Sequence, residues 1–137
     1  MMNSLRSRGG ELGITFAERP ILANSRLAIE ASEYAGDKGA HSLFSEKVFQ
    51  AYFTYGRNIG ELDVILDIAA AAGLDREEVR RVLADGINAP RRLQNAAEAG
   101  RLGINSVPTF IINESRQLVG AQPAEAFASL FARLERA

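Results

Sequence analysis

Cysteine is absent from the 137 residues of this sequence. Without it the chain can form no disulfide, no catalytic thiolate and no zinc site built on thiolates. Histidine occurs once, as His41, at a predicted helix start where a surface or capping role outweighs catalysis. Asp63 and Asp67 lie one helical turn apart, but no second pair of metal ligands accompanies them, so we interpret them as solvated. We therefore expect no catalytic residue, no metal site and no cofactor within these residues.

An excess of either charge is also missing. The sequence has 16 Lys and Arg against 17 Asp and Glu, a net charge of -1, and both signs are scattered along its length. No basic footprint results, so we do not expect nucleic acid as a partner. The adjacent pair Arg91 and Arg92 is predicted to be a solvated helix face.

Long apolar runs are likewise absent. Asp63 and Asp67 interrupt the most apolar stretch, so no run reaches the roughly 20 residues that span a bilayer. Residues 1–10 are polar apart from Leu5 and the starting methionines, and they lack the apolar core of a secretory signal. We therefore expect no membrane partner and a cytoplasmic location.

The apolar residues that are present suffice for a core. They make up 47% of the sequence, and its length fits one compact domain. After a short apolar segment at 12–16, the spacing of apolar residues predicts five helices. The second is the most aromatic part of the sequence, so it must be largely buried or cover a groove. The five helices are predicted at about 25–35, at about 40–55, from 62 to a cap at Gly73, from a cap at Asp75 to Gly86, and at about 90–99.

The pattern changes after Leu102. The β-branched and aromatic run 109–112 is typical of a buried strand, and residues 113–116 and 117–119 predict a hairpin turn and a return strand. An apolar stripe over 124–136 predicts a terminal helix. Because the strand must cover one face with that helix, we expect one shared core made of Phe110, Ile112, Phe127, Leu130 and Phe131.

The most informative segments are 103–110 and 120–123, which read Gly-Ile-Asn-Ser-Val-Pro-Thr-Phe and Gly-Ala-Gln-Pro. A proline directly before a buried strand cannot donate a ladder hydrogen bond, so its position needs a reason. The first segment resembles the cis-proline loop of the DsbA branch of thioredoxin-fold proteins, with Ser106 in place of the usual glycine. The second resembles the corresponding segment of the FrnE-type dithiol-disulfide isomerases of that branch. Residues 24–74 also resemble the helical insert of these isomerases.

This resemblance implies an α/β fold in a single domain spanning 1–137, an incomplete thioredoxin-like fold. A large helical insert would cover about 20–101, and the C-terminal half of the thioredoxin fold, a β-hairpin plus a helix, about 102–137. The resemblance also implies a cis Val107–Pro108 bond, with Val107, Pro108 and Thr109 as the residues that contact a substrate peptide. The resemblance implies a thiol-disulfide oxidoreductase. Because the Cys-x-x-Cys segment of the family has no matching position in this sequence, we expect the chain to be inactive alone.

Two other functions stay open. One is a non-catalytic module for peptide binding or homodimeric assembly. The other is a relative of 2-hydroxychromene-2-carboxylate isomerase, which shares the fold but uses an N-terminal serine with glutathione, and Gly-Ala-Gln-Pro speaks against it.

The expected partner is a second copy of the chain. In the complete fold an N-terminal strand would cover the edge of strand 109–112, and without it that edge is bare. We expect a homodimer that buries this edge and part of the aromatic second helix, unless residues 12–16 fold back as a surrogate strand.

Overall fold

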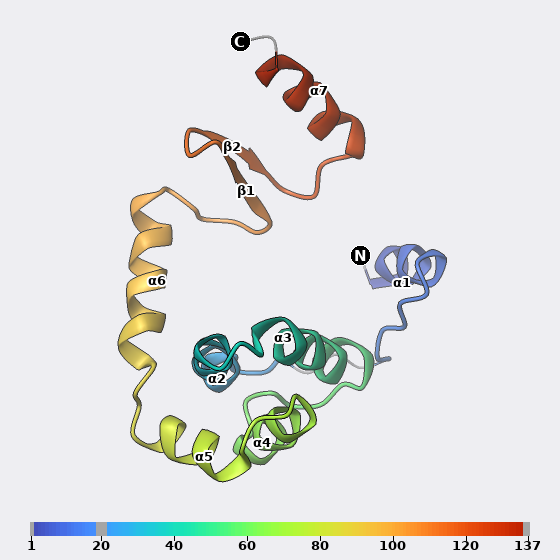
Figure 1. Cartoon of the computed structure of the whole chain (residues 1–137). Coiled ribbons are helices and arrows are strands. Elements are labelled where there is room, and N and C mark those ends of the chain that lie inside the picture. The colour runs from blue at the N-terminus through green and yellow to red at the C-terminus, as the bar shows by residue number, and fades with distance from the viewer. Residues whose placement is uncertain (1, 19–21, 136–137) are drawn as a thin grey trace. The chain divides into compact units, whose positions relative to one another are not determined.

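The computed structural model of the chain describes residues 2–18 and 22–135, and these form helices and one two-stranded antiparallel sheet (Figure 1). The chain divides into two compact units, residues 1–94 and 95–137. The elements in chain order are α1 (Met2–Glu11), α2 (Arg26–Asp37), α3 (His41–Phe49), the π-helix η1 (Gln50–Thr54), α4 (Leu62–Ala71), α5 (Arg76–Ala84), α6 (Ala89–Arg101), β1 (Thr109–Ile112), β2 (Arg116–Val119) and α7 (Ala124–Leu134).

The first unit has a helical core to which α2, α3, α4 and α5 all contribute. Helix α4 is the most apolar of the four and buries half of its residues, while Asp63 and Asp67 lie on its exposed face. The other helices turn one apolar stripe inward. The largest fully buried side chains of this core are Phe44, Ile65, Leu66 and Val79.

The ends of α4 and α5 follow the predicted local signals. Gly73 has a φ of +82° and closes α4, where the N–H of Leu74 donates to the carbonyl of Ala69. Asp75 caps α5, because its Oδ1 accepts a hydrogen bond from the N–H of Glu78 at 2.7 Å. The carboxylate of Glu78 accepts instead from Lys38 Nζ at 3.0 Å.

The predicted helix 40–55 is α3 followed by the π-helix η1. The N–H of Tyr55 donates to the carbonyl of Gln50, five residues back, at 3.0 Å. Such π-helical turns are rare and often occur at functional sites. Within and just after this turn Ala51 is buried, whereas Phe53 and Tyr55 remain exposed.

The sequence did not predict α1. Its residues carry no apolar stripe, so contacts made by neighbouring backbone stabilise it instead: Arg6 Nη2 donates to the carbonyls of Ala17, at 2.9 Å, and Glu18, at 2.7 Å. Gly9 lies against the ring of Phe16, where a Cβ atom would come within 2.6 Å of ring carbon Cε2. Residues 12–16 are not a strand in the structure, so they do not fold back as a surrogate strand.

The prediction of a solvated Arg91–Arg92 pair is wrong for Arg92, whereas Arg91 is exposed. Arg92 Nε lies 3.0 Å from the Oε1 atom of Glu30, a side chain that is only 1% exposed. Arg26 Nη1 lies 3.3 Å from the other carboxylate oxygen of Glu30. Arg91 Nη1 lies 3.0 Å from Asp37 Oδ1. The pairs made by Arg92 and Arg91 hold the start of α6 against α2, and the buried carboxylate of Glu30 obtains the cationic partners that it needs.

Asp67 is also more than a solvated residue. It accepts hydrogen bonds from Arg76, at 2.5 Å, and from Arg57, at 2.7 Å. The Arg76 guanidinium, followed by that of Arg57, lowers the pKa of Asp67 below its usual value. Asp63 lies 3.5 Å from Arg76 but is largely exposed. The acidic pair therefore binds arginines on the surface of the helical unit.

The second unit contains the predicted hairpin, in which Thr109 pairs with Val119 and Ile112 with Arg116. The ring of Phe110 meets that of Phe127 edge to face, with centroids 4.9 Å apart.

The single shared core predicted for this unit is wrong in part. Leu130 is buried, but Phe110 and Phe131 are 39% and 48% exposed. Ile111 is exposed too, so the predicted buried strand is not buried. The reason is that two strands and one helix offer too little surface to enclose these side chains on every side.

Candidate functional site

The candidate peptide-binding site is the loop that joins α6 to β1. Helix α6 ends at Arg101, and Gly103, which has a φ of +70°, then reverses the chain. There the N–H of Ile104 donates to the carbonyl of Ala99 at 2.9 Å. This glycine-capped end is the usual way for a helix to stop, and it directs residues 104–108 toward the strand.

The peptide bond between Val107 and Pro108 is cis, as the resemblance of this loop implies. Val107 is 88% exposed, and no hydrogen bond of the described residues involves its backbone N–H or C=O. The hydroxyl of Thr109 donates to the carbonyl of Ser106 at 2.7 Å and closes the loop on itself. The loop thus presents a backbone donor and acceptor that are accessible to a ligand.

The hairpin brings the two informative segments together. The N–H of Gly120, which has a φ of +85°, donates to the carbonyl of Pro108 at 2.7 Å. The amide of Gln122 then donates to the carbonyl of Val119 at 2.9 Å. Gly-Ala-Gln-Pro is therefore the segment that fixes Pro108 from the side of β2.

The register also decides which backbone groups of β1 face away from β2. In an antiparallel pair, hydrogen-bonded and non-hydrogen-bonded positions alternate. Since Pro108 and Gly120 form a hydrogen-bonded position, Val107, Thr109 and Ile111 direct their N–H and C=O groups to the other edge. Over the part of the chain that the structure describes, no strand pairs with that edge. The three predicted contact residues therefore begin an open edge.

The side chains of this loop offer no acid, base or thiol. Residues 103–109 contain no ionisable side chain and no cysteine, and their only side-chain hydroxyls are those of Ser106 and Thr109. Within residues 2–18 and 22–135, no group of three His, Asp or Glu residues is arranged to hold a metal ion. His41, the single histidine, begins α3 in the helical unit.

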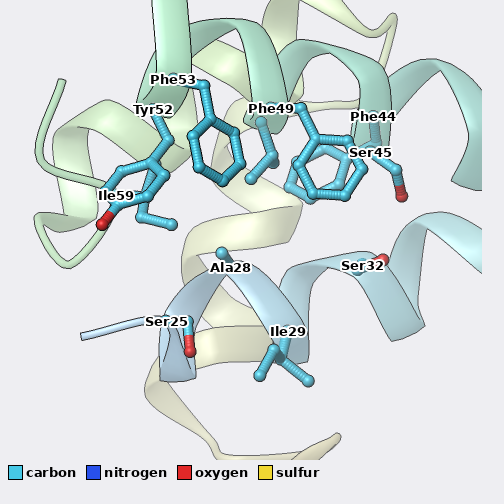
Figure 2. Close-up of a pocket in the computed structure, with 11 residues that line it drawn as sticks. Ser25, Ala28, Ile29, Ser32, Phe44, Ser45, Phe49, Tyr52, Phe53 and Ile59 are labelled. Atoms are coloured by element: carbon cyan, nitrogen blue, oxygen red, sulfur yellow. The ribbon is translucent and has the colours of Figure 1, made fainter. Parts of the chain in front are cut away.

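A second feature was foreseen only as a possible groove. Between α2 and the consecutive helices α3 and η1 lies a cavity of about 310 Å³ (Figure 2). Aromatic rings from α3 and η1, among them Phe49 and Phe53, extend toward α2 in Figure 2. The aromatic content of 40–55 indicated the wall, but the short side chains of α2 that leave the space carry no recognisable signal.

The fold and the loop define the class of protein. The family model for the DSBA-like thioredoxin domain matches residues 1–132, so the chain belongs to the DSBA-like thioredoxin domain family. This confirms the predicted fold class, a DsbA-like fold with mostly helical content and a two-stranded sheet.

The chain is also similar to two individual proteins. The crystal structure of a probable DsbA oxidoreductase from Streptomyces coelicolor matches with a TM-score of 0.85 and 26% identity, over 96% of this chain and 57% of that one. The uncharacterized protein YwbO of Bacillus subtilis (strain 168) is 30% identical over 90 residues, which are 65% of this chain and 45% of that protein. The chain thus spans about half the length of these two relatives.

The helices give no sign of a membrane-spanning segment. None of those in the described residues is long and apolar enough to cross a bilayer.

Proposed function

We propose that the chain supplies the peptide-binding half of a thiol-disulfide oxidoreductase of the FrnE type and has no redox turnover by itself. The observation that carries this proposal is the exposed Val107, whose backbone N–H and C=O are unpaired at the start of the open edge of β1. An extended peptide adds to such an edge through main-chain hydrogen bonds, with little dependence on its sequence. Val107 would make the first of these bonds, and Thr109 the next.

The absence of turnover follows from the chemistry of disulfide exchange. The reaction proceeds by attack of a thiolate on a disulfide sulfur, and these 137 residues contain no cysteine. A thiolate would have to come from outside them, from a longer chain or from another polypeptide. A cytoplasmic location is part of this proposal, because a chain without cysteine gains no disulfide from an oxidising compartment.

The proposal is tested by peptide binding and by a thiol-exchange assay. An extended decapeptide without cysteine is titrated into the ¹⁵N-labelled chain, and the amide shifts are expected to concentrate at Val107, Thr109 and Ile111. The same peptide, N-methylated at alternate residues so that it cannot donate to the edge, is expected to bind about ten-fold more weakly, since it loses one or two hydrogen bonds. Insulin reduction is expected to match the protein-free control.

Either of two results would contradict the proposal. Shifts spread over the helical unit, with equal affinity for both peptides, would show that the edge is not the binding site. Insulin reduction above the control by the cysteine-free chain would overturn the chemistry.

The open edge also favours a second candidate, a homodimer in which two copies pair through β1. Ile111 and Val119 lie on the same face of the hairpin and are 42% and 47% exposed, so pairing would bury apolar surface as well as backbone groups. A two-fold axis lets the same edge serve both copies. The proposed dimer also buries part of the aromatic helix α3–η1.

The variant Ile111→Pro tests this dimer. Its proline removes an N–H that points away from β2, so the hairpin keeps its ladder while the edge loses a donor. We expect the unmodified chain to be a dimer by light scattering and the variant to be a folded monomer by circular dichroism. If the unmodified chain stays monomeric and cooperatively folded across a dilution series, the dimer is excluded. The edge of β1 would then be free to bind a peptide.

A further inference from the structure

The cavity between α2 and α3–η1 is a built site in the helical unit. Its volume of about 310 Å³ lies at the lower end of the range typical of small-molecule pockets. No charged side chain lines it, and its polar groups are the hydroxyls of three serines and a tyrosine. The lining consists of Ser25, Ala28, Ile29, Ser32, Phe44, Ser45, Val48, Phe49, Tyr52, Phe53 and Ile59.

One wall of the cavity is a cluster of aromatic rings. The ring of Phe53 lies at its centre, with centroids 4.8 Å from Tyr52 and 6.1 Å from Phe49. The ring of Phe16 meets Phe53 edge to face at 6.2 Å. Phe49 and Phe53 are nevertheless 60% and 45% exposed. A ligand seated against them would remove apolar ring surface from water, which is the main favourable term in binding to such pockets.

The opposite wall and the floor explain why the space stays open. Ala28 and Ser32 of α2, and Ser25 just before it, have side chains too short to reach the rings (Figure 2). Phe44 and Ile59 at the floor are buried in the core, which holds them in place. The π-helical turn η1 sets the positions of Tyr52 and Phe53. The cavity is therefore framed by packed helices.

We propose that this cavity binds an uncharged, largely apolar small molecule with a planar ring system of about naphthalene size. A carboxylate, phosphate or ammonium group would lose its hydration there without gaining an ion pair, because the lining carries no charge. An uncharged ring can stack against Phe49 and Phe53, and one polar substituent can reach a serine hydroxyl. This inference rests on the helical unit alone and is independent of the peptide binding proposed for the Val107 loop, whereas a dimer that covers Phe49 and Phe53 would exclude it.

The neutral fluorophore N-phenylnaphthylamine is the probe for this site. The chain contains no tryptophan, so protein emission does not overlap its signal. We expect its fluorescence to rise saturably with one molecule bound per chain. Its sulfonated analogue, anilinonaphthalene sulfonate, is expected to bind at least about ten-fold more weakly, because its charge has no partner in the cavity.

Three variants locate the binding. Phe49→Ala removes one exposed ring of the wall, and Ile29→Trp fills the space from α2, so each is expected to weaken binding of the neutral probe at least about ten-fold. Leu43→Ala is the matched control, because Leu43 is a half-exposed apolar residue of α3 that does not line the cavity. The affinity of Leu43→Ala for the neutral probe is expected to stay within about two-fold of that of the unmodified chain. Circular dichroism verifies that each variant is folded.

Several outcomes would overturn the assignment. Fluorescence that never saturates, or equal losses in Phe49→Ala and Leu43→Ala, would show that the probe adheres to the surface without using the cavity. Tighter binding of the sulfonated analogue would contradict a neutral ligand. An apparent Kd that rises with protein concentration would show that a second copy covers these rings.

Discussion

The variant Arg92→Ala is expected to lower the free energy of unfolding of the helical unit by about 3 kcal/mol. Arg92 lies 3.0 Å from Glu30, whose side chain is 1% exposed, so the variant leaves a buried carboxylate short of a partner. Breaking a buried ion pair from one side typically costs about 3–5 kcal/mol. We expect the lower end of this range because Arg26 still pairs with Glu30 in the variant. The side chain of Arg26 is itself half exposed. Urea denaturation followed by circular dichroism measures the change.

The neighbouring residue provides the matched control. Arg91 pairs with Asp37 and Glu33 at the surface, so Arg91→Ala is expected to cost less than about 1 kcal/mol. Replacing both buried partners, as in Glu30→Leu with Arg92→Met, is expected to recover most of the loss, because no buried charge remains. Equal losses for Arg92→Ala and Arg91→Ala would contradict the burial of Glu30 that the structure shows.

The variant Phe44→Ala is expected to cost about 3–5 kcal/mol of stability. Phe44 is fully buried and forms part of both the helical core and the floor of the apolar cavity. Truncation removes the transfer free energy of the ring and leaves a void that packed helices fill only partly. The void left by the ring would join the existing cavity beside Phe44 and enlarge it. The loss is measured by the same urea denaturation.

Phe49 is the control for this variant, since it is the same residue type five residues further along α3. Its ring is 60% exposed, so Phe49→Ala is expected to change stability by less than about 1 kcal/mol. A loss similar to that of Phe44→Ala would mean that Phe49 is buried in solution, for instance by a second copy of the chain.

The loop from Gly103 to Pro108 shows how far the sequence leads. The resemblance of the segment from Gly103 to Phe110 to a family loop implied a cis bond, and the structure has it at Val107–Pro108. The sequence did not reveal that Gly120 holds the carbonyl of Pro108, because a hydrogen bond between residues so far apart depends on the register of the hairpin. The register also directs the backbone groups of Val107, Thr109 and Ile111 to the open edge.

Local signals sufficed for most of the helices. Apolar spacing, the cap at Asp75 and the left-handed Gly73 act within a few residues, so α2, α4, α5 and α6 could be read directly. Helix α1 was not predicted, because contacts from Arg6 and Gly9 to residues farther along the chain stabilise it.

The sequence by itself determined most of the helices and the hairpin, the absence of thiol chemistry within these residues and the family to which the motifs point. Tertiary structure alone decided which charges are buried and where space remains. Glu30 has the sequence surroundings of a surface residue, yet α6 brings Arg92 against it. The cavity arises because short side chains of α2 face the rings of α3 and η1. Both features depend on surfaces meeting across long sequence separations, and periodicity within a single helix carries no information about its partner.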